Sequence, residues 1–550
     1  MTETLDIAIA QINPTVGDVD GNVGLIKAAR AEAGDADLVA MGELAVSGYP
    51  PEDLVLKAAF LDAIEESVRA LAEETGDGGP ALLLGAPWRQ DGELHNAALL
   101  LDGGEIAAVR LKHHLPNYGV FDEKRVFAPG PLPGPVAFRD VRLGVMICED
   151  MWEADVTECL EESGAGILVV LNGSPFDVNK GDERLNHAVA RVVESGLPLI
   201  YVNLVGGQDE LVFDGASFVL GAGRELRAQA AAWETGILAT RWRRRDGWAC
   251  DQGPVSEPLG DQETTWRAMT TGLRDYVDKN GFPGVLIGLS GGIDSALSAA
   301  VAVDALGPER VRCVMMPSPY TSPDSIEDAG EVARLLGVRL RSIAIDPAMD
   351  AFGAMLGEAF ADAEADVTEE NIQARCRGII LMALSNKFGD MVLSTGNKSE
   401  MSVGYATLYG DMCGGFSVLK DVYKSTVFAL ARWRNGHRPG GTLKGPGGPV
   451  MPDRVITKPP SAELKPDQTD QDSLPPYDQL DAILRLLIED DMAPDAITER
   501  GHDPAIVARV WRLLERAEYK RRQAPPGVKI TGRAFGRDRR YPITNGFTGP

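Results

Sequence analysis

Three residues that could carry nucleophilic chemistry follow apolar segments in the first half of the chain. Cys148 comes directly after the apolar residues 142–147. A free thiol has a pKa of roughly 8.5, so it needs a base or a cation beside it to react near pH 7. Glu43 and Lys112 also follow apolar segments, and they offer a base for the thiol proton and a cation for a developing oxyanion. From the residues alone, an inert core cysteine is the alternative interpretation of Cys148.

A second candidate site is a glycine-rich string that joins an apolar segment to a helical one. Two adjacent glycines let backbone N–H groups approach an anion, and the following helix presents its positive end. Serine hydroxyls add donors, and an aspartate can hold Mg²⁺ against phosphates. The string is neither a Walker loop nor a G-x-G-x-x-G fingerprint, and a plain strand-to-helix turn is the alternative for its two glycines. It predicts a phosphate-binding loop made of Gly288, Leu289, Ser290, Gly291, Gly292, Ile293, Asp294 and Ser295.

Composition limits the class of protein. The 550 residues include 54 Lys+Arg and 81 Asp+Glu, a net charge of −27, which argues against binding nucleic acid through bulk charge. No apolar run is long enough to span a membrane, and the first residues do not read as a signal peptide. The six Cys never form C-x-x-C, and the six His are too dispersed to suggest a metal cluster. We expect a cytoplasmic enzyme with more than one domain.

The elements that must position the candidate residues alternate between strands and helices. In the first half we expect a helix within 54–74 and strands at 6–11, 81–85, 142–147 and 167–171. In the second half we expect strands at 285–289, 311–316, 340–345 and 391–394, and helices at 295–306, 325–336 and 371–388. Strands separated by helices predict a parallel, doubly wound sheet in this α/β half.

A change of composition divides the chain into two parts. Residues 241–246 are basic and read as non-periodic, and a Gly- and Pro-containing stretch follows them. We interpret 243–262 as a linker between a domain at 1–242 and another at 263–550; the alternative is a long loop inside one domain. A second stretch rich in Gly and Pro, 436–452, predicts a mobile loop.

The sequence segments around Glu43, Lys112 and Cys148 resemble those of the glutamine-amidase branch of the nitrilase/amidase superfamily. The resemblance rests on residues 42–54, 112–123 and 148–150, in that order. It implies an α-β-β-α sandwich with Glu43 as general base, Lys112 as oxyanion and positioning residue and Cys148 as nucleophile. It also implies a supporting role for Glu123 and contacts to a glutamine substrate from Tyr118, Glu123, Ser174 and Lys180. We expect His113 and His114 to be surface or packing residues.

The string at 288–295 resembles the loop of the N-type ATP pyrophosphatases, which cleave ATP between the α and β phosphates. Further segments, at 371–377, 393–400, 404–411, 461–464 and 518–522, are similar to those of NAD synthetases. With the amidase half in front, the chain resembles the glutamine-dependent NAD synthetases. The resemblance implies glutamine hydrolysis, adenylation of deamido-NAD by ATP with Mg²⁺, attack by ammonia, and release of AMP, pyrophosphate and glutamate. It also suggests a homo-oligomer.

This second resemblance assigns roles by position. It implies that the string, together with Thr395 and Lys424, binds ATP and that Asp294 and Glu400 hold the magnesium ion. It implies that deamido-NAD is contacted by Asn371, Arg375, Glu400 and Lys520. In one departure, Leu408 stands where stand-alone synthetases often carry Lys, which puts the substrate contacts of that loop in question.

Two other functions stay open. Another amidotransferase of the pyrophosphatase type, such as a GMP synthetase, would share the ATP loop, but it usually carries a Cys-His-Glu glutaminase, and Cys148 lacks such a His context. A nitrilase-type amidase fused to a nucleotide-binding regulatory domain would hydrolyse glutamine equally with and without ATP. Pyrophosphate release on a panel of substrates separates these functions from a two-site ligase.

Overall fold

The computed structural model describes residues 3–437, 440–466 and 468–547. The chain forms two compact units, residues 1–259 and residues 260–550, and each is described by itself. Within the described residues, every helix is too short or too polar to cross a membrane.

The first unit is built on two large sheets. The seven-stranded sheet has the order β15-β14-β1-β2-β3-β4-β5, and the six-stranded sheet has the order β13-β12-β9-β8-β7-β6, with a separate β10-β11 hairpin. In each sheet the three central strands are parallel: β1, β2 and β3 in one, and β7, β8 and β9 in the other. The strands are β1 Thr4–Gln11, β2 Leu38–Ala40, β3 Ala81–Gln90, β4 Glu93–Asp102, β5 Glu105–Leu111, β6 Val136–Phe138, β7 Val141–Ile147, β8 Ile167–Asn172, β9 Leu199–Asn203, β10 Val205–Gln208, β11 Leu211–Asp214, β12 Phe218–Leu220, β13 Leu226–Gln229, β14 Gly236–Arg244 and β15 Trp248–Cys250.

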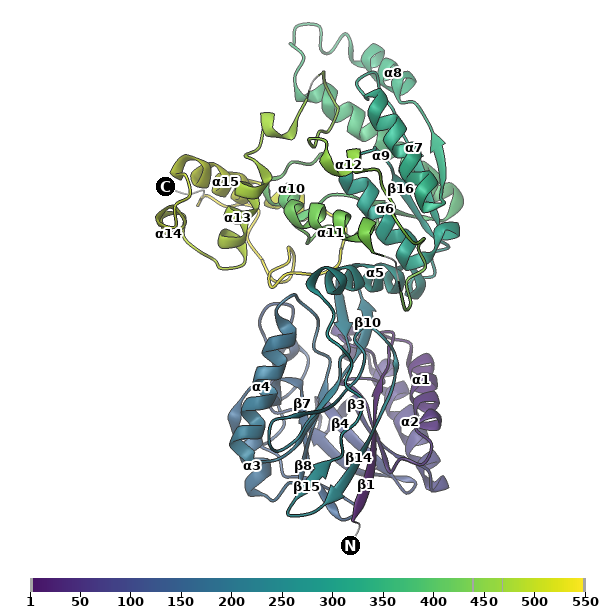
Figure 1. The fold of residues 1–550 in the computed structure, drawn as a ribbon, viewed down its shortest axis with the longest axis vertical. Helices are drawn as coiled ribbons and strands as arrows, with labels where there is room; N and C mark the ends of the chain where they lie inside the picture. Colours follow the sequence, from purple (N-terminus) through teal and green to yellow (C-terminus); the bar gives the residue numbers. More distant parts are fainter. Residues whose placement is uncertain (1–2, 438–439, 467, 548–550) are drawn as a thin grey trace. The chain divides into compact units, whose positions relative to one another are not determined.

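The two sheets pack face to face, and helices cover both outer faces (Figure 1). Along β1, Ile7 and Ile9 point into the core between the sheets, whereas Ala8 and Ala10 point to the outer helices. This period of two fits a strand buried on both faces. Helices α1 and α2 cover one sheet, and α3 and α4 cover the other. The helices are α1 Val19–Glu32, α2 Ala58–Glu74, α3 Ala154–Glu162 and α4 Lys180–Ser195, with short 3₁₀ turns at Glu52–Leu56, Thr75–Asp77, Glu123–Arg125 and Cys148–Met151. The predicted α-β-β-α sandwich is therefore confirmed.

The second unit contains the predicted doubly wound sheet, and its five strands are all parallel, in the order β18-β17-β16-β19-β20. The chain order reverses between β16 and β19, which is where such sheets bind ligands at the carboxyl ends of their strands. The strands are β16 Val285–Gly288, β17 Val311–Met315, β18 Arg339–Ser342, β19 Met391–Ser394 and β20 Phe416–Ser417.

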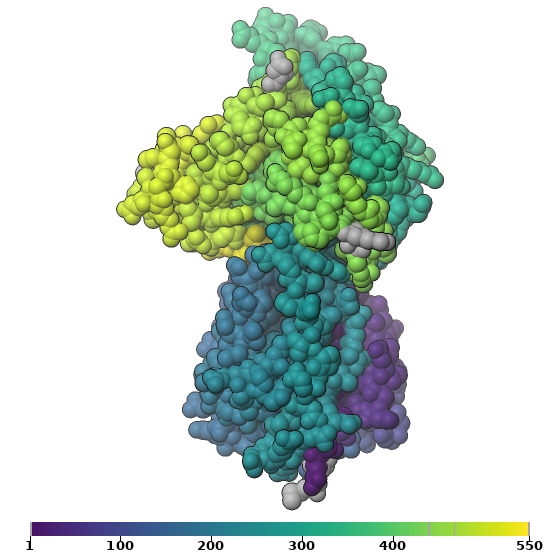
Figure 2. Space-filling model, viewed as in Figure 1, coloured from purple at the N-terminus to yellow at the C-terminus, as the bar shows by residue number. Residues whose placement is uncertain are grey.

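Helices surround this sheet and continue into a C-terminal helical lobe, which is yellow-green to yellow in Figures 1 and 2. Leu480, Leu484 and Leu487 recur at helical spacing on α13 and pack with Val507, Val510 and other side chains of α15 into the core of the lobe. The helices are α5 Asp261–Lys279, α6 Ile293–Leu306, α7 Pro323–Leu336, α8 Asp346–Leu356, α9 Val367–Phe388, α10 Lys398–Val403, α11 Lys424–Gly436, α12 Asp453–Thr457, α13 Tyr477–Ile488, α14 Pro494–Glu499, α15 Pro504–Arg516 and α16 Glu518–Arg521, with 3₁₀ turns at Pro308–Arg310 and Asp470–Asp472.

The segment predicted as a linker, 243–262, differs in the structure. Its first residues end β14, and β15 follows, so both belong to the seven-stranded sheet. Trp242 is buried in the sheet core while Arg241 and Arg243 are exposed, so the basic run does have the period of a strand. The division between the units lies at 259/260, and α5 begins at Asp261.

The stretch 436–452, predicted to be a mobile loop, includes residues 438 and 439, which lie outside the described residues. The Arg434 guanidinium donates to the carbonyl groups of Pro446 (2.8 Å) and Gly448 (3.3 Å). Val450 and Met451 are buried, and their backbone N–H groups donate to Asn435. The described end of this stretch is therefore anchored rather than free.

Candidate active sites

Cys148 lies at a sharp turn at the carboxyl end of β7. Its backbone has φ = +47°, a region that residues other than glycine rarely adopt. The Asp150 carboxylate accepts the backbone N–H of Ile147 at 3.1 Å and closes the turn. Strained backbone of this kind is common where a functional side chain must be held in one position. The turn places the thiol in a buried site at the end of the strand.

The structure brings Glu43 and Lys112 together beside this thiol. The Lys112 ammonium donates to the Glu43 carboxylate at 2.7 Å and to the Glu123 carboxylate at 2.8 Å. All three side chains are buried, and the Cys148 thiol interacts electrostatically with each of them. The strands of this sandwich therefore assemble one buried cation, two carboxylates and one thiol, as the resemblance implied.

Three further groups complete the cluster, and the sequence analysis did not identify them. The Asn96 amide on β4 donates to Glu43 at 2.7 Å, and the backbone N–H of Gly173 donates to the other Glu43 oxygen at 3.0 Å. The Tyr49 hydroxyl donates to Glu123 at 3.3 Å. These donors come from segments far apart in sequence, so no local pattern marks them. The first two hold both oxygens of the Glu43 carboxylate, and the third supports Glu123.

Burial and charge shift the ionisation of this cluster. Burial raises the pKa of the Cys148 thiol well above its usual value, and the Glu43 carboxylate raises it further. Burial also raises the pKa of Glu123 to about 7, although the Lys112 ammonium opposes the shift. Burial alone would lower the pKa of Lys112, but Glu123 and Glu43 outweigh it, and the pKa lies well above normal. The thiol therefore needs Glu43 to remove its proton.

The residues predicted to contact glutamine have different partners in the structure. The exposed Tyr118 hydroxyl donates to the carboxylate of Glu149 at 3.0 Å, and the ammonium of Lys180 lies over the ring of Trp152. Ser174 is buried, and its hydroxyl accepts a hydrogen bond from Arg184 at 3.0 Å. Glu123 lies in the buried cluster with Lys112, where it supports the cation.

In the second unit, the predicted phosphate loop lies at the carboxyl end of β16. Gly291 has φ = +82°, and a Cβ there would lie 2.2 Å from the carbonyl oxygen of Ser325, so only glycine fits. The Ser295 hydroxyl accepts the backbone N–H of Ser290 at 3.1 Å, and the Ser290 hydroxyl accepts that of Gly292 at 3.2 Å. These bonds fold the loop onto the first turn of α6, whose positive end favours an anion.

The predicted magnesium residues lie together next to this loop. The Lys424 ammonium forms ion pairs with the carboxylates of Asp294 and Glu400, the latter at 3.1 Å. The Asn397 amide donates to Asp294 at 2.9 Å, and Asp470 lies near the same ammonium. Asn397 and Asp470 were not identified from the sequence. Carboxylate oxygens are the ligands that Mg²⁺ prefers, so this set of donors fits that ion.

A cavity of about 320 Å³ lies beside these carboxylates, at the point where the strand order reverses. The phosphate loop, Thr395, Glu400 and Lys424 line it, together with Arg377 and Lys458, two cations that the sequence analysis did not single out. Burial raises the pKa of Glu400 to about 7, and Lys424 opposes this shift. The cavity therefore combines groups that can bind an anion with carboxylates that can share a cation.

Three of the residues predicted to contact deamido-NAD surround the neighbouring segment 404–408. The Lys520 ammonium donates to the carbonyl groups of Gly404 and Ala406, both at 2.7 Å. The Arg375 guanidinium donates to the carbonyl of Leu408 at 3.3 Å, and the Asn371 side chain accepts from Thr407 at 2.9 Å. Among the described residues that line the cavity, none is one of these three, but two, Tyr405 and Ala406, belong to the segment that they hold.

Comparison with known families finds a match for each of the two units. The carbon-nitrogen hydrolase model matches residues 6–245, and the NAD synthase model matches residues 265–524. Each match covers one of the two units.

Full-length relatives carry both units. A glutamine-dependent NAD(+) synthetase of Rhodobacter capsulatus is 49% identical over 549 residues, covering 99% of each chain. Another, from Xanthomonas campestris pv. campestris, is 47% identical and covers 99% of this chain and 98% of its own. The structure of a glutamine-dependent NAD+ synthetase of Acinetobacter baumannii, in complex with ADP, has a TM-score of 0.78 at 42% identity and covers 99% of each chain. The protein described here belongs to the family of glutamine-dependent NAD(+) synthetases.

Proposed function

We propose that the protein converts deamido-NAD to NAD with ATP, using ammonia that it releases from glutamine. The observation that carries this proposal is the presence, in one chain, of a buried thiol–carboxylate–lysine cluster and a phosphate loop beside a cavity with carboxylates. The first can hydrolyse an amide, and the second can activate a carboxylate with ATP. The names of the relatives give glutamine as the nitrogen source and NAD(+) as the product.

In the first unit, Glu43 takes the proton of Cys148, and the thiolate sulfur forms a bond to the side-chain carbonyl carbon of glutamine. The Lys112 ammonium stabilises the charge that develops on the carbonyl oxygen. The C–N bond then breaks, and Glu43 returns its proton to the leaving nitrogen, which departs as ammonia. A thioester remains on Cys148.

Water then releases glutamate. Glu43 removes a proton from the water, and the water oxygen attacks the thioester carbon. The Cys148 thiolate then leaves and takes back a proton. Glu149 follows Cys148 and is held by Tyr118, with the Lys180 cation nearby. We infer that this half-buried pair of opposite charges receives the ammonium and carboxylate of the amino acid.

In the second unit, a carboxylate oxygen of deamido-NAD attacks the α phosphorus of ATP, and pyrophosphate leaves. The backbone of the phosphate loop and the N-terminus of α6 bind the phosphates. Asp294 and Glu400 would hold Mg²⁺, which when bound neutralises phosphate charge and favours the departure of pyrophosphate. The Lys424 ammonium, released from these carboxylates, pairs with a phosphate oxygen.

Ammonia then attacks the acyl-adenylate carbon, and AMP leaves. Near pH 7 most free ammonia is the unreactive ammonium ion, so we propose that ammonia reaches the second site without equilibrating with water. Unlabelled glutamine supplied together with ¹⁵N-ammonium tests this transfer. We expect NAD without the label; label in proportion to the free ammonium pool would contradict it.

The function is tested by mass spectrometry of the product formed from deamido-NAD, ATP and glutamine, with pyrophosphate measured in parallel. We expect the mass of NAD and one pyrophosphate for each NAD. Turnover of another nucleotide carboxylate or acceptor in place of deamido-NAD would favour a different amidotransferase. Glutamine hydrolysis that is equal with and without ATP, with no pyrophosphate, would favour an amidase with a regulatory domain.

Assembly and location are separate predictions. We propose a homo-oligomer, as the family resemblance suggests, and size-exclusion chromatography with light scattering tests it through the molar mass. A mass equal to that of a single 58.9 kDa chain would contradict this proposal. The cytoplasmic location stays a prediction.

A further inference from the structure

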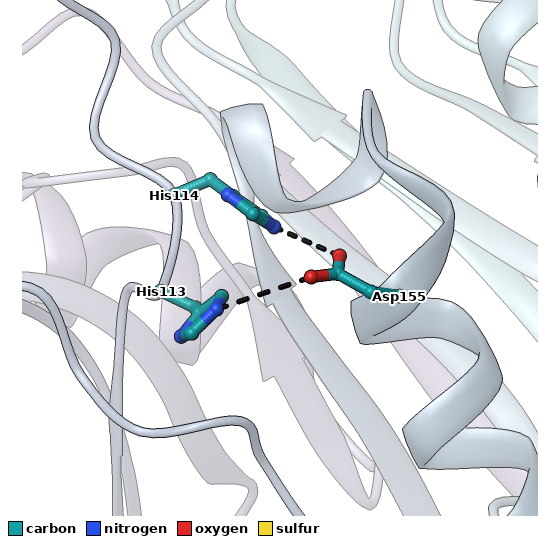
Figure 3. A group of neighbouring side chains, drawn as sticks. All are labelled: His113, His114 and Asp155. Atoms are coloured by element: carbon teal, nitrogen blue, oxygen red, sulfur yellow. Dashed lines mark hydrogen bonds and ion pairs between the residues drawn. The ribbon is translucent and has the colours of Figure 1, made fainter.

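Two neighbouring histidines and an aspartate of the first unit form a cluster outside the site described above (Figure 3). His113 and His114 follow Lys112 in the segment after β5, and Asp155 lies in the first turn of α3. The Nε2 atom of His114 lies 2.8 Å from one oxygen of Asp155, and that of His113 lies 4.0 Å from the other. One candidate ligand atom from each of the three residues lies within 4.8 Å of the others.

These separations suit a single small ion. In a tetrahedral zinc site with bonds of about 2.0–2.1 Å, neighbouring ligand atoms lie about 3.3 Å apart. The two observed separations, 2.8 and 4.0 Å, lie on either side of that value, so movements of less than about 1 Å bring both rings and the carboxylate onto one ion. The side chains of His113, His114 and Asp155 are 26%, 27% and 47% exposed, so an ion and a water molecule can reach them.

The ring of His113 is already held in the orientation that a metal ligand needs. Its Nδ1 atom lies 2.7 Å from the carbonyl oxygen of Gly130, and only an N–H group can bond there. In the neutral ring the hydrogen is therefore on Nδ1, and the lone pair of Nε2 faces Asp155. A lone pair that faces a carboxylate oxygen is unfavourable unless a cation lies between them. Metal-binding histidines are commonly fixed through the other ring nitrogen in this way.

The backbone of the pair is fixed as well. The buried Asp150 carboxylate accepts the backbone N–H groups of His113 at 3.0 Å and His114 at 2.8 Å. Its other oxygen closes the turn at Cys148 through Ile147. The two histidines are thus positioned by the same carboxylate that shapes the nucleophile turn, and an ion bound to them would link α3 to this turn.

We propose that His113, His114 and Asp155 bind a divalent transition-metal ion of the zinc class, with a fourth position open to water. Two imidazoles and one carboxylate suit Zn²⁺ and its neighbours in the first transition series, whereas Mg²⁺ and Ca²⁺ prefer oxygen ligands. The site is therefore chemically distinct from the carboxylate set of the second unit. The sequence analysis expected the histidines to be surface or packing residues. Asp155 lies 41 residues beyond His114, so no local spacing connects the three.

The test uses the full-length Cys148→Ala protein, which lacks the thiol that could itself bind zinc, in buffer with excess Mg²⁺ to occupy carboxylate sites. Equilibrium dialysis measures Zn²⁺ affinity, and Co²⁺ absorption reports ligand geometry. We expect a saturable site and d–d bands of a four-coordinate ion. His114→Gln and Asp155→Asn, each added to this background, should weaken binding by at least about tenfold and remove the bands.

His187→Gln, in the same background, is the matched control. This histidine belongs to the same unit and is partly exposed, but its ring stacks on Trp152 with a centroid separation of 4.0 Å. We expect its affinity for Zn²⁺ to equal that of the parent. Circular dichroism without metal confirms that each variant is folded. The proposal is overturned if the parent binds no Zn²⁺, if the cluster variants bind as tightly as the parent, or if His187→Gln weakens binding equally.

Discussion

The two candidate sites contain the same arrangement of charges, a buried lysine between two carboxylates, in different surroundings. In the first unit Lys112 joins Glu43 and Glu123, and all of the charged groups are enclosed. In the second unit Lys424 joins Asp294 and Glu400, whose side chains are 18% and 16% exposed and lie beside a cavity. The carboxylates around the lysine are enclosed in one site and border an open cavity in the other.

This difference matches the proposed chemistry. Glutamine presents a neutral amide to the first site, so the charges must be preformed and only protons need to move. ATP brings several negative charges to the second site, so its carboxylates must first give up one cation and accept another. Lys424 neutralises the carboxylates of that site before the substrate arrives. Changes in the two sites should therefore have different consequences.

The largest expected effect distinguishes the activities of the two units. Cys148→Ala removes the nucleophile, so we expect glutamine-supported NAD synthesis to fall by a factor of about 10³ or more. Synthesis from added ammonium chloride should stay within about twofold, because the second site keeps all its residues. Both rates are measured by NAD formation with saturating ATP and deamido-NAD. If ammonium does not rescue the variant, the division of labour between the units is wrong.

The next effect compares the two lysines by stability. Lys112→Met leaves two enclosed carboxylates without their cation, so we expect the free energy of unfolding of the first unit to fall by about 3–5 kcal/mol. Lys424→Met should cost the second unit less, about 1–2 kcal/mol, because water in the cavity reaches its carboxylates. Urea unfolding followed by hydrogen exchange measures the free energy of unfolding of each unit.

The double variant Lys112→Met/Glu43→Gln is the control for the first unit. It removes one of the two stranded carboxylates, so it should recover part of the lost stability. Equal losses for the two lysine variants would show that the two sites do not differ in the way their surroundings suggest.

A contrast between local motifs and contacts made only in the folded chain explains what the sequence could predict. Glu43, Lys112 and Cys148 each follow an apolar strand within a local motif that can be read in the sequence, although the strands belong to two sheets, β2 and β5 to one and β7 to the other. The phosphate loop is likewise one continuous string. Asn96 and Asp470 could not be found in this way, because each reaches its cluster only through the tertiary fold.

The linker prediction was wrong for residues 243–250, for a related reason, whereas the division between the units, at 259/260, lies inside the predicted segment. Arg241 and Arg243 drew attention to charge, although the residue between them, Trp242, is buried in the sheet. β14 pairs with β1, at the other end of the unit's sequence, so its strand character depends on a distant partner. A strand segment with several exposed arginines resembles a loop in the sequence until its pairing partner is known.

A smaller effect tests whether Lys424 occupies the place of a cation. Without nucleotide, Lys424→Met frees the carboxylates of Asp294 and Glu400, so we expect Mn²⁺, used in place of Mg²⁺, to bind about tenfold more tightly. Electron paramagnetic resonance of free Mn²⁺ measures the affinity. The matched variant Lys458→Met removes another cation of the cavity wall, one that contacts Asp328 instead, and should change it little. Weaker binding in Lys424→Met would mean that the lysine organises these carboxylates rather than competing for them.

The last expected effect lies in the pH dependence of stability and distinguishes burial from ion pairing in the enclosed site. The pKa of Glu123 rises from its ordinary value of 4.5 to about 7, because burial outweighs Lys112. Between these values the folded state binds more protons than the unfolded state, so this group makes the first unit less stable as pH rises. Glu123→Gln cannot lose a proton, so its free energy of unfolding, minus that of the wild type, should grow from pH 4.5 to 7 and then stay constant. Urea unfolding of both proteins across this range measures the difference. A difference that shrinks as pH rises would mean that the Lys112 ion pair, rather than burial, controls the ionisation of the Glu123 carboxyl.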